Sequence, residues 1–456
     1  MNPIGAVILV VLILVVTCAS RRVALLGMMA GVLYLTQSQQ ITVAGFNLYA
    51  IRFLELVGFI RVMIRKEFSF TRLNGIDRSV FWLYGFSTVI YLLRSSEGQA
   101  YQIGVAVDAF LAYFTFRGLI ESIDEFQWFL GAMLVLLAPY MGLLVFERLT
   151  GHNWFTLLGG VESGYFMRDD RPRCFGSFRH PSLLGTLGAS FLPLYIGLAF
   201  IKAERIRAYI GIGLCVGIVW ASNSGGPMSS AAFAVVGWLF WKQRTKMRRV
   251  RWALVGMIAL AALVMKAPVW YLLARVSSLT GGDGWHRSYL IDMCFQHLDV
   301  WWLAGVPIRE TSGWFPYDLG TTGGADITNE FISFGITAGL LAMALFILML
   351  ARALSRIGKA TANIRSRSPD PSETEFFLWG LGVMVVVHIV NWLGITYFDQ
   401  TYMIWFMQLA AVSNLTEKYF EMPALEVTDA DTAPAEKSGE NGDMPAVNAV
   451  LQTRFC

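Results

Sequence analysis

The chain has 456 residues, of which 55% are hydrophobic, 14% are aromatic and only 15% are charged, and its formal net charge is +4. The mean hydropathy is +0.54. This composition excludes an ordinary soluble globular domain and indicates an integral membrane protein. We expect no nucleic-acid partner.

About thirteen apolar runs follow one another along the chain, several of them shorter than the ~20 residues that cross a bilayer comfortably. They lie near residues 4–19, 23–36, 41–60, 79–93, 100–119, 126–146, 182–201, 206–221, 229–241, 250–266, 328–351, 376–394 and 400–415. The pattern predicts an all-α integral membrane protein with about 12–14 transmembrane helices. These helices would form a polytopic domain over residues 1–420, whose two long external loops carry short amphipathic helices.

Connections rich in Lys and Arg alternate with connections poor in them, which is typical of a protein whose basic loops face the cytoplasm. This alternation predicts an external N-terminus and a cytoplasmic C-terminus. Residues 421–456 have almost no aromatic side chains and are rich in Ala, Pro, Glu and Asp, so we expect a disordered cytoplasmic tail there. The long loops 147–182 and 267–328 fall on the external face. Arginines are less common in external loops than in cytoplasmic ones, so those in these two loops could have a function.

The first external loop ends in an arginine and a histidine, Arg179 and His180, directly before Pro181. Proline suits the first position of a helix, so both side chains should lie at the mouth of the next span. A helix N-terminus favours phosphate, and a guanidinium there adds a bidentate donor. The alternative is an arginine that reaches lipid headgroups, which we favour for Arg168 and Arg171. The loop arginines could also pair with acids of the same loop, such as Glu147, Asp169 and Asp170.

The second external loop contains GGDGWHRSYLIDMCFQHL, which predicts a glycine-marked turn, an Asp283 cap and a helix that carries His286 and Arg287. Aromatic residues crowd this loop, and they suit either sugar rings or a membrane interface. They are Trp285, Tyr289, Trp301, Trp302, Trp314 and Tyr317. The next span opens with Asn329 and Glu330, which could belong to a site or form an ordinary helix cap.

The five cysteines, at 18, 174, 215, 294 and 456, show no CxxC spacing and no Cys/His pairing, so we expect no metal site and no cofactor. Cys174 and Cys294 both fall in the external loops. An oxidising compartment would allow a disulfide between them. Two unpaired thiols are the favoured alternative, because a sequence does not give the separation of their Cα atoms.

Four segments, in their order and loop placement, together resemble the O-antigen polymerase and O-antigen ligase superfamily. They are GSFRHPSLLGTL, ASNSGGPMSS, HRSYLIDM with WWLAGV, and TNEFISFGITAGLL. The resemblance covers roughly residues 170–345, and the outer spans match only in hydropathy. Thr328 stands where the ligases carry a histidine, and Asn223-Ser224-Gly225-Gly226-Pro227 replaces their usual Ser-Arg-Gly. These departures favour a polymerase over a ligase.

The resemblance implies a metal-independent membrane glycosyltransferase of the bacterial inner membrane, acting on undecaprenyl-diphosphate-linked oligosaccharides at the periplasmic face. Arg179 and Arg287 would hold the donor diphosphate, because arginine stays protonated and can replace a divalent metal. A base near pH 7 would deprotonate the acceptor hydroxyl, with His180, His286 and Glu330 as candidates in that order. The substrate-binding candidates are Arg173, Asn329, Trp285, Tyr289 and Trp302. Polysaccharide assembly and export proteins would be its partners.

Two alternatives come from other classes of protein. A transporter of lipid-linked oligosaccharide should carry charge inside its spans, where Arg52, Glu55, Asp108 and His388 lie. Arg52 and Glu55 share one helical face and could either form a buried pair that holds the bundle or line a path. The concentration of polar residues in two external loops and the absence of internal repeats favour the enzyme. A non-catalytic assembly partner is the third interpretation.

Overall fold

We analysed the chain as a computed structural model. It describes residues 1–43, 46–161, 164, 166–168, 170–275, 284–314, 324–367 and 370–421. The predicted tail after residue 421, the Asp283 cap, Tyr317 and Asp169 lie outside the described residues. Within them the protein is helical apart from two short hairpins, so the all-α class is confirmed.

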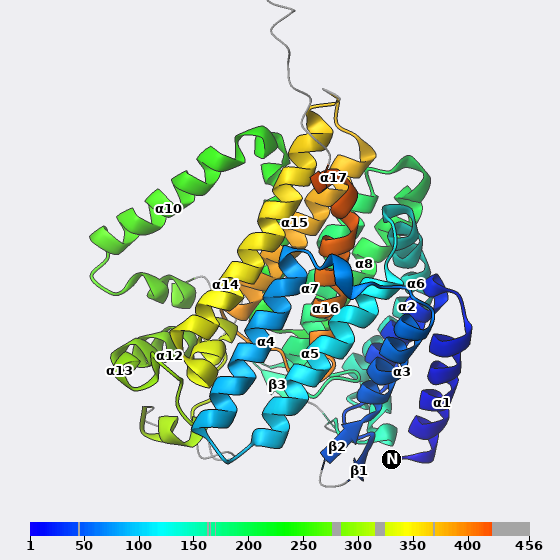
Figure 1. Cartoon of the computed structure of the whole chain (residues 1–456), viewed down its shortest axis with the longest axis horizontal. Coiled ribbons are helices and arrows are strands. Elements are labelled where there is room, and N and C mark those ends of the chain that lie inside the picture. The colour runs from blue at the N-terminus through cyan, green and yellow to red at the C-terminus, as the bar shows by residue number, and fades with distance from the viewer. Residues whose placement is uncertain are drawn as a thin grey trace, which may run out of the picture.

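Long helices form most of the described chain (Figure 1). They are α1 (Pro3–Cys18), α2 (Arg21–Tyr34), α3 (Ala50–Ile64), α4 (Gly75–Arg94), α5 (Gln99–Leu119), α6 (Ile123–Thr150), α7 (Pro181–Leu198), α8 (Arg205–Ser222), α9 (Gly225–Leu239), α10 (Met247–Val264), α12 (Gly284–Gln296), α13 (Leu298–Trp301), α14 (Glu330–Arg365), α15 (Glu373–Trp392), α16 (Thr401–Leu415) and α17 (Glu417–Glu421). The hairpins pair β1 (Gln40–Val43) with β2 (Phe46–Tyr49), and β3 (Phe166–Arg168) with β4 (Arg171–Arg173), both antiparallel.

Every apolar run found in the sequence coincides with a helix, but one boundary was wrong. Residues 40–49 belong to the β1–β2 hairpin, and α3 begins only at Ala50. Alternating residues such as Ile41 and Thr42 pair across this hairpin with Leu48 and Asn47. The apolar run 41–60 therefore contains a strand pair followed by a helix. Apolar content alone does not distinguish a strand from a helix.

Among the described residues, five helical segments are long and apolar enough to cross a membrane. They are Ile123–Thr150, Pro181–Leu198, Lys202–Ser222, Glu330–Arg365 and Glu373–Trp392. A sixth candidate is the pair Gly225–Val264 and Val269–Arg275, which bends by 104° at a short break. The remaining apolar helices are shorter or less apolar, and α1 is the one that approaches this class.

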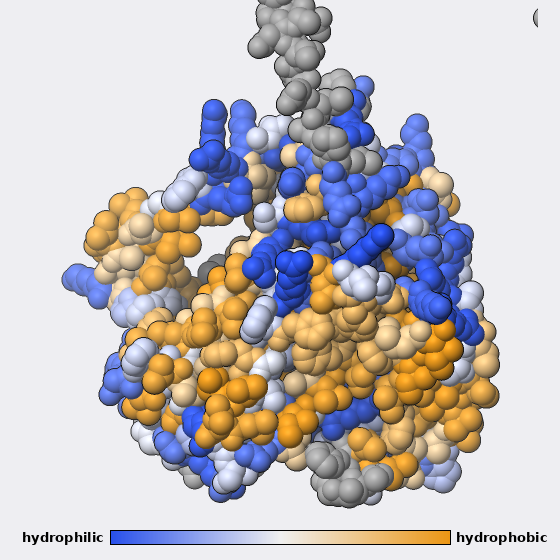
Figure 2. Space-filling view, in the orientation of Figure 1, coloured by the Kyte–Doolittle hydropathy of each residue, from blue (hydrophilic) through white to orange (hydrophobic). Residues whose placement is uncertain are grey.

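The helices pack as one bundle around α7, whose residues are almost all buried. It contacts α8, α9 and α15 along its length. The N-terminus and α17 lie at opposite ends of the bundle (Figure 1). Hydrophilic side chains gather at the end that carries α17, and hydrophobic side chains cover the middle (Figure 2). Helix α10 departs from this packing, because it has no buried residue and stands away from the body.

A second, smaller core lies under the external helices α12 and α13. It is fastened to α14 where that helix breaks, at Ala338 and Gly339. The Val306 N–H donates to the Ile336 carbonyl (2.8 Å), and the Leu340 N–H donates to the Trp302 carbonyl (2.8 Å). Two backbones meet here at contact distance, which explains the glycines in WWLAGV and GITAGLL.

Gly305 and Gly339 are the glycines that permit this contact. Both have a positive φ, of 75° and 86°. A Cβ at Gly305 would lie 2.2 Å from the Ile336 carbonyl oxygen, and a Cβ at Gly339 would lie 2.3 Å from the Leu303 carbonyl oxygen. Only glycine combines this conformation with so close an approach.

Candidate functional site

Two helix N-termini meet on the side of the bundle that carries the two long loops predicted to be external. Pro181 occupies the first position of α7 as predicted, and His180 is its N-cap. Helix α9 begins beside it at Gly225. The hydroxyls of Ser182 and Ser224 are hydrogen-bonded to each other (2.6 Å) and tie the two N-termini together. Their positive dipole ends favour an anion here. The first N–H groups of α7 are not available to it, because Pro181 has none and that of Ser182 donates to His180.

Arg173, at the end of β4, is the most unusual cation near these helices. The residue is only 6% exposed, and its Nε has no hydrogen-bond partner. Its guanidinium lies over the ring of Phe166, 5.3 Å from the centroid. Burial, together with the positive charges of Arg168 and Arg287, lowers the pKa of Arg173 to about 10. A buried guanidinium whose Nε is unpaired is costly, so this site retains the capacity to bind an acceptor.

Arg287 reaches the same region from the second external loop, on α12. A Cβ at Gly394, which follows α15, would lie 2.8 Å from Cζ of Arg287. A Cβ at Gly226, the second residue of α9, would lie 3.7 Å from its Nη2. The guanidinium of Arg287 therefore rests against two glycines, between the start of α9 and the end of α15.

The pKa of His180 depends on the charges around it. Burial, together with the positive charges of Arg173 and Arg287, lowers the pKa of His180 to about 4. Arg168 acts in the same direction. The imidazole is therefore neutral at pH 7 and lies in a positive field made by residues from both external loops.

The hydrogen bonding of His180 bears on its candidate role as a base. Its Nδ1 accepts from the Ser182 N–H (3.1 Å), so the proton of the neutral ring sits on Nε2. Nε2–H can then donate to a ligand oxygen but cannot accept a proton. His286 is in a different position, because it lies close enough to Asp326 to oppose the rise in the Asp326 pKa that burial causes. His286 therefore has a carboxylate near it, whereas Nδ1 of His180 already accepts a hydrogen bond.

Arg179 does not join this cluster. Its Nε donates to Oδ1 of Asp399 (2.8 Å), and its Nη2 donates to the same oxygen. The Arg179 side chain is still 54% exposed, whereas that of Asp399 is 1% exposed. Asp399 lies in the connection before α16, and it keeps a buried Oδ2 without a hydrogen-bond partner. This ion pair gives Arg179 a partner that the sequence analysis did not name.

Asn329 and Glu330 start α14 and hold it to the connection after α15. Asn329 is the N-cap and accepts from the Ile332 N–H (3.1 Å), so the ordinary cap is confirmed. Its amide also donates to the Leu393 carbonyl (3.5 Å). Glu330 accepts from the Tyr397 N–H (2.9 Å). Both side chains thereby position the segment that carries Gly394.

The external aromatic residues divide into exposed and buried groups. Trp285 is 52% exposed and stacks on Tyr289, with ring centroids 5.0 Å apart. Trp302 is 51% exposed. Trp301 and Trp314 belong instead to the small core under α12. The exposed rings are the ones that remain available to a ligand or to a membrane interface.

The acids and cysteines of the external loops have structural partners. Glu147 accepts from the Phe175 N–H (2.7 Å) and the Gly176 N–H (3.0 Å), so the expectation that it pairs with loop arginines was wrong. Cys174 and Cys294 are free and buried in separate cores, which confirms unpaired thiols. Across the described ranges no group of three or more His, Cys, Asp or Glu could hold a metal ion.

The charged residues inside the bundle pair differently from the expectation. Arg52 donates to both oxygens of Asp108 on α5 (2.7 and 2.8 Å). Glu55 accepts from the Tyr402 hydroxyl (2.6 Å) instead of pairing with Arg52. His388 is hydrogen-bonded between Tyr397 and Gln408. These contacts join α3 to α5 and α15 to α16.

No protein-family model matches the chain, and no curated protein sequence matches it.

Proposed function

We propose that this protein is a polymerase of lipid-linked repeat units in surface polysaccharide biosynthesis, acting as a metal-independent membrane glycosyltransferase. The observation that carries the proposal is the convergence of Arg173, Arg287 and neutral His180 at the joined N-termini of α7 and α9. Two guanidinium groups and two helix dipoles suit a diphosphate better than a singly charged ligand. The residues come from both external loops, which agrees with the resemblance to the O-antigen polymerase and ligase superfamily.

The proposal places the protein in the bacterial inner membrane as a polytopic bundle. The convergent arginines would face the periplasm, where undecaprenyl-diphosphate-linked glycans are presented. The alternation of basic connections along the sequence supports this orientation, and hydrophilic side chains gather at the end of the bundle that carries α17 (Figure 2). The external N-terminus and cytoplasmic C-terminus of the proposal agree with the positions of the two ends of the described chain.

The chemistry assigned to the site is displacement at an anomeric carbon. The hydroxyl oxygen of the acceptor glycan attacks the anomeric carbon of the donor. The bond between that carbon and the undecaprenyl diphosphate oxygen breaks. Arg173 and Arg287 stabilise the negative charge that develops on the leaving oxygen, and His180 Nε2–H donates to the same group. His286, which lies near Asp326, takes the proton of the acceptor hydroxyl. The exposed pair Trp285 and Tyr289 offers flat apolar faces to the sugar rings.

Two other functions remain as outcomes of the test. Transfer of the glycan to a different acceptor, as in O-antigen ligases, would use the same diphosphate site. A transporter is favoured by one observation, because Glu55 is fully buried in α3 and its Oε2 has no hydrogen-bond partner. The pairing of Arg52 with Asp108 argues for a structural role of the neighbouring charges instead.

The test uses purified protein in lipid with undecaprenyl-diphosphate-linked repeat units from its host, with products resolved by length. Wild type should give a ladder of longer lipid-linked chains, and Arg287→Ala should lower the rate by at least the roughly 10²-fold typical of one electrostatic donor. Arg171→Gln is the matched control, because Arg171 is exposed at the tip of the β3–β4 hairpin. An unchanged rate in Arg287→Ala would refute the assignment. Glycosylation of added lipid A core without chain growth would establish the ligase.

A further inference from the structure

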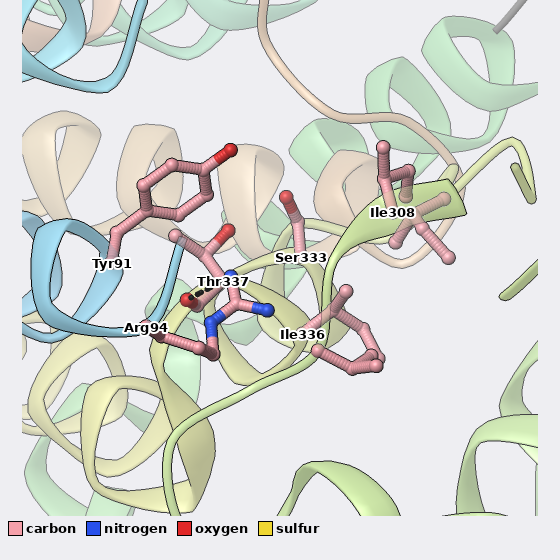
Figure 3. A pocket seen from close by; sticks show the side chains of 8 residues that line it. Tyr91, Arg94, Ile308, Ser333, Ile336 and Thr337 are labelled. Carbon is pink, nitrogen blue, oxygen red and sulfur yellow. Dashed lines mark hydrogen bonds between the residues drawn. The ribbon is translucent and has the colours of Figure 1, made fainter. Parts of the chain in front are cut away.

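A small pocket lies between α4, the first half of α14 and the 3₁₀ helix Ile308–Trp314 (Figure 3). Its volume is about 100 Å³, well above the roughly 10–15 Å³ that a single water requires. The lining residues are Tyr91, Arg94, Val306, Ile308, Ile327, Ser333, Ile336 and Thr337. The pocket is separate from the cationic cluster at α7 and α9, and none of its residues has a role in the proposed reaction.

Arg94 gives this pocket its chemistry. Its Nη2 donates to the Thr337 carbonyl (3.3 Å), one of the free carbonyls where α14 breaks. Its Nε and Nη1 are buried atoms with no hydrogen-bond partner. Figure 3 shows the guanidinium pointing into the space bounded by Ser333 and Ile336. Unpaired guanidinium donors beside an open volume call for an acceptor oxygen, because leaving them unpaired is costly.

The other walls suit a small negative group. Tyr91 lies under the Arg94 guanidinium, 5.1 Å from Cζ to the ring centroid, and holds it in place. Ser333 and Thr337 offer hydroxyls that can donate, and isoleucine side chains close the remaining sides. No carboxylate is among the described residues that line the pocket, although the charge of Glu310, on the neighbouring 3₁₀ helix, acts on Arg94. A group with several acceptor oxygens would therefore gain both charge pairing and hydrogen bonds.

We propose that this pocket is a second anion site, which binds one carboxylate or phosphate group of a ligand whose remaining bulk stays outside. The volume admits such a group. Seven residues of helix separate Glu330 from Thr337, so the pocket lies roughly 10 Å along α14 from the start of that helix. If the proposed function holds, the ligand is an acidic or phosphorylated glycan, and only this identification rests on that function.

The experiment measures how fast a single cysteine in the pocket reacts with charged reagents. Ser333→Cys is made in the full chain with Cys18→Ser and Cys456→Ser, because the remaining native cysteines are buried. The labelling rates of an anionic and a cationic methanethiosulfonate are compared. The anionic reagent should react roughly tenfold faster, as one nearby positive charge in a partly desolvated site would cause. Arg94→Gln should abolish this preference.

Arg309→Gln is the matched control, because it removes an equal charge from the 3₁₀ helix that carries Ile308. Arg309 is exposed and pairs with Glu97 (3.1 Å), so its loss should leave the preference unchanged. Arg94→Lys covers the case in which Arg94→Gln does not fold. It should keep the preference for the anionic reagent, because it keeps the charge.

Inorganic phosphate and glucuronate, each added at constant ionic strength, identify the ligand group. Protection of the thiol by glucuronate alone indicates a carboxylate, protection by phosphate alone indicates a phosphate, and either result supports the site. Equal rates for the two reagents, a preference that survives Arg94→Gln, or no protection by either anion would overturn it. Labelling needs no turnover, so its outcome is independent of whether the protein transfers glycan.

Discussion

Gly394→Ala should inactivate the protein without destabilising it, because the added methyl group would displace Arg287. The new Cβ would lie 2.8 Å from Cζ and 2.9 Å from both Nε and Nη1 of Arg287. Ordinary contacts begin at 3.4 Å, so the guanidinium must move by roughly 0.6 Å. A misplacement of about 1 Å in a catalytic group can cost about 10²-fold in rate. We therefore expect the rate of chain growth to fall by about 10- to 100-fold.

The stability of the same variant should change little. Gly394 is not among the residues with positive φ, so alanine fits its backbone. The clash falls on the end of a flexible side chain, which can rotate away. Replacing glycine by alanine at a compatible position raises the free energy of unfolding by about 0.4–1 kcal/mol. The midpoint of thermal unfolding should therefore stay the same or rise slightly while activity is lost.

Gly226→Ala is the matched control on the other side of the same guanidinium. Its Cβ would lie 3.7 Å from Nη2 of Arg287 and 3.5 Å from Oδ1 of Asn391, which are ordinary contacts. Initial rates of polymerisation and thermal unfolding are measured for both variants. Full activity in Gly394→Ala would refute the reasoning, because it would mean that the guanidinium is not needed where the structure places it. Equal losses in both variants would also contradict it.

Three further predictions concern other parts of the molecule. Arg173→Gln should lower the polymerisation rate by at least about 10²-fold. It should leave the unfolding midpoint unchanged or higher, since it removes a buried charge whose Nε has no hydrogen-bond partner. Arg171→Gln should change neither the rate nor the midpoint. The pKa of His180 is about 4 in the folded protein against 6.5 for an ordinary histidine, so unfolding takes up a proton between these pH values and stability should fall as the pH drops from 6.5 to 4. His180→Asn keeps a capping side chain, and its unfolding midpoint should fall less over that window; an identical pH profile would contradict the assignment. Gly305→Ala should destabilise the protein by about 2–5 kcal/mol, from the positive φ and the clash with the Ile336 carbonyl, whereas Gly313→Ala meets nothing within 4 Å and should unfold like wild type in a denaturant titration.

The sequence by itself determined the all-α class of the protein and the approximate positions of its long helices. Apolar runs of helical length predict helices reliably because burial of apolar side chains drives their formation locally. The same logic predicted that Pro181 starts α7 and offered a cap by Asn329 as one of two alternatives for the start of α14, since caps depend on residues close in sequence. It failed at residues 40–49, where an apolar stretch pairs as a hairpin instead of extending α3.

Tertiary structure alone decided which charges meet. Arg179, the favoured arginine, pairs with Asp399, which is 220 positions away, and Arg52 pairs with Asp108 rather than with its helical neighbour Glu55. Arg173, which drew less attention, is the buried arginine whose Nε has no hydrogen-bond partner. Coulombic pairing depends on distance in space, and the packing of distant helices sets that distance. A sequence therefore supplies the charged groups of a helical bundle, but only the packing of its helices determines which of them remain available to a ligand.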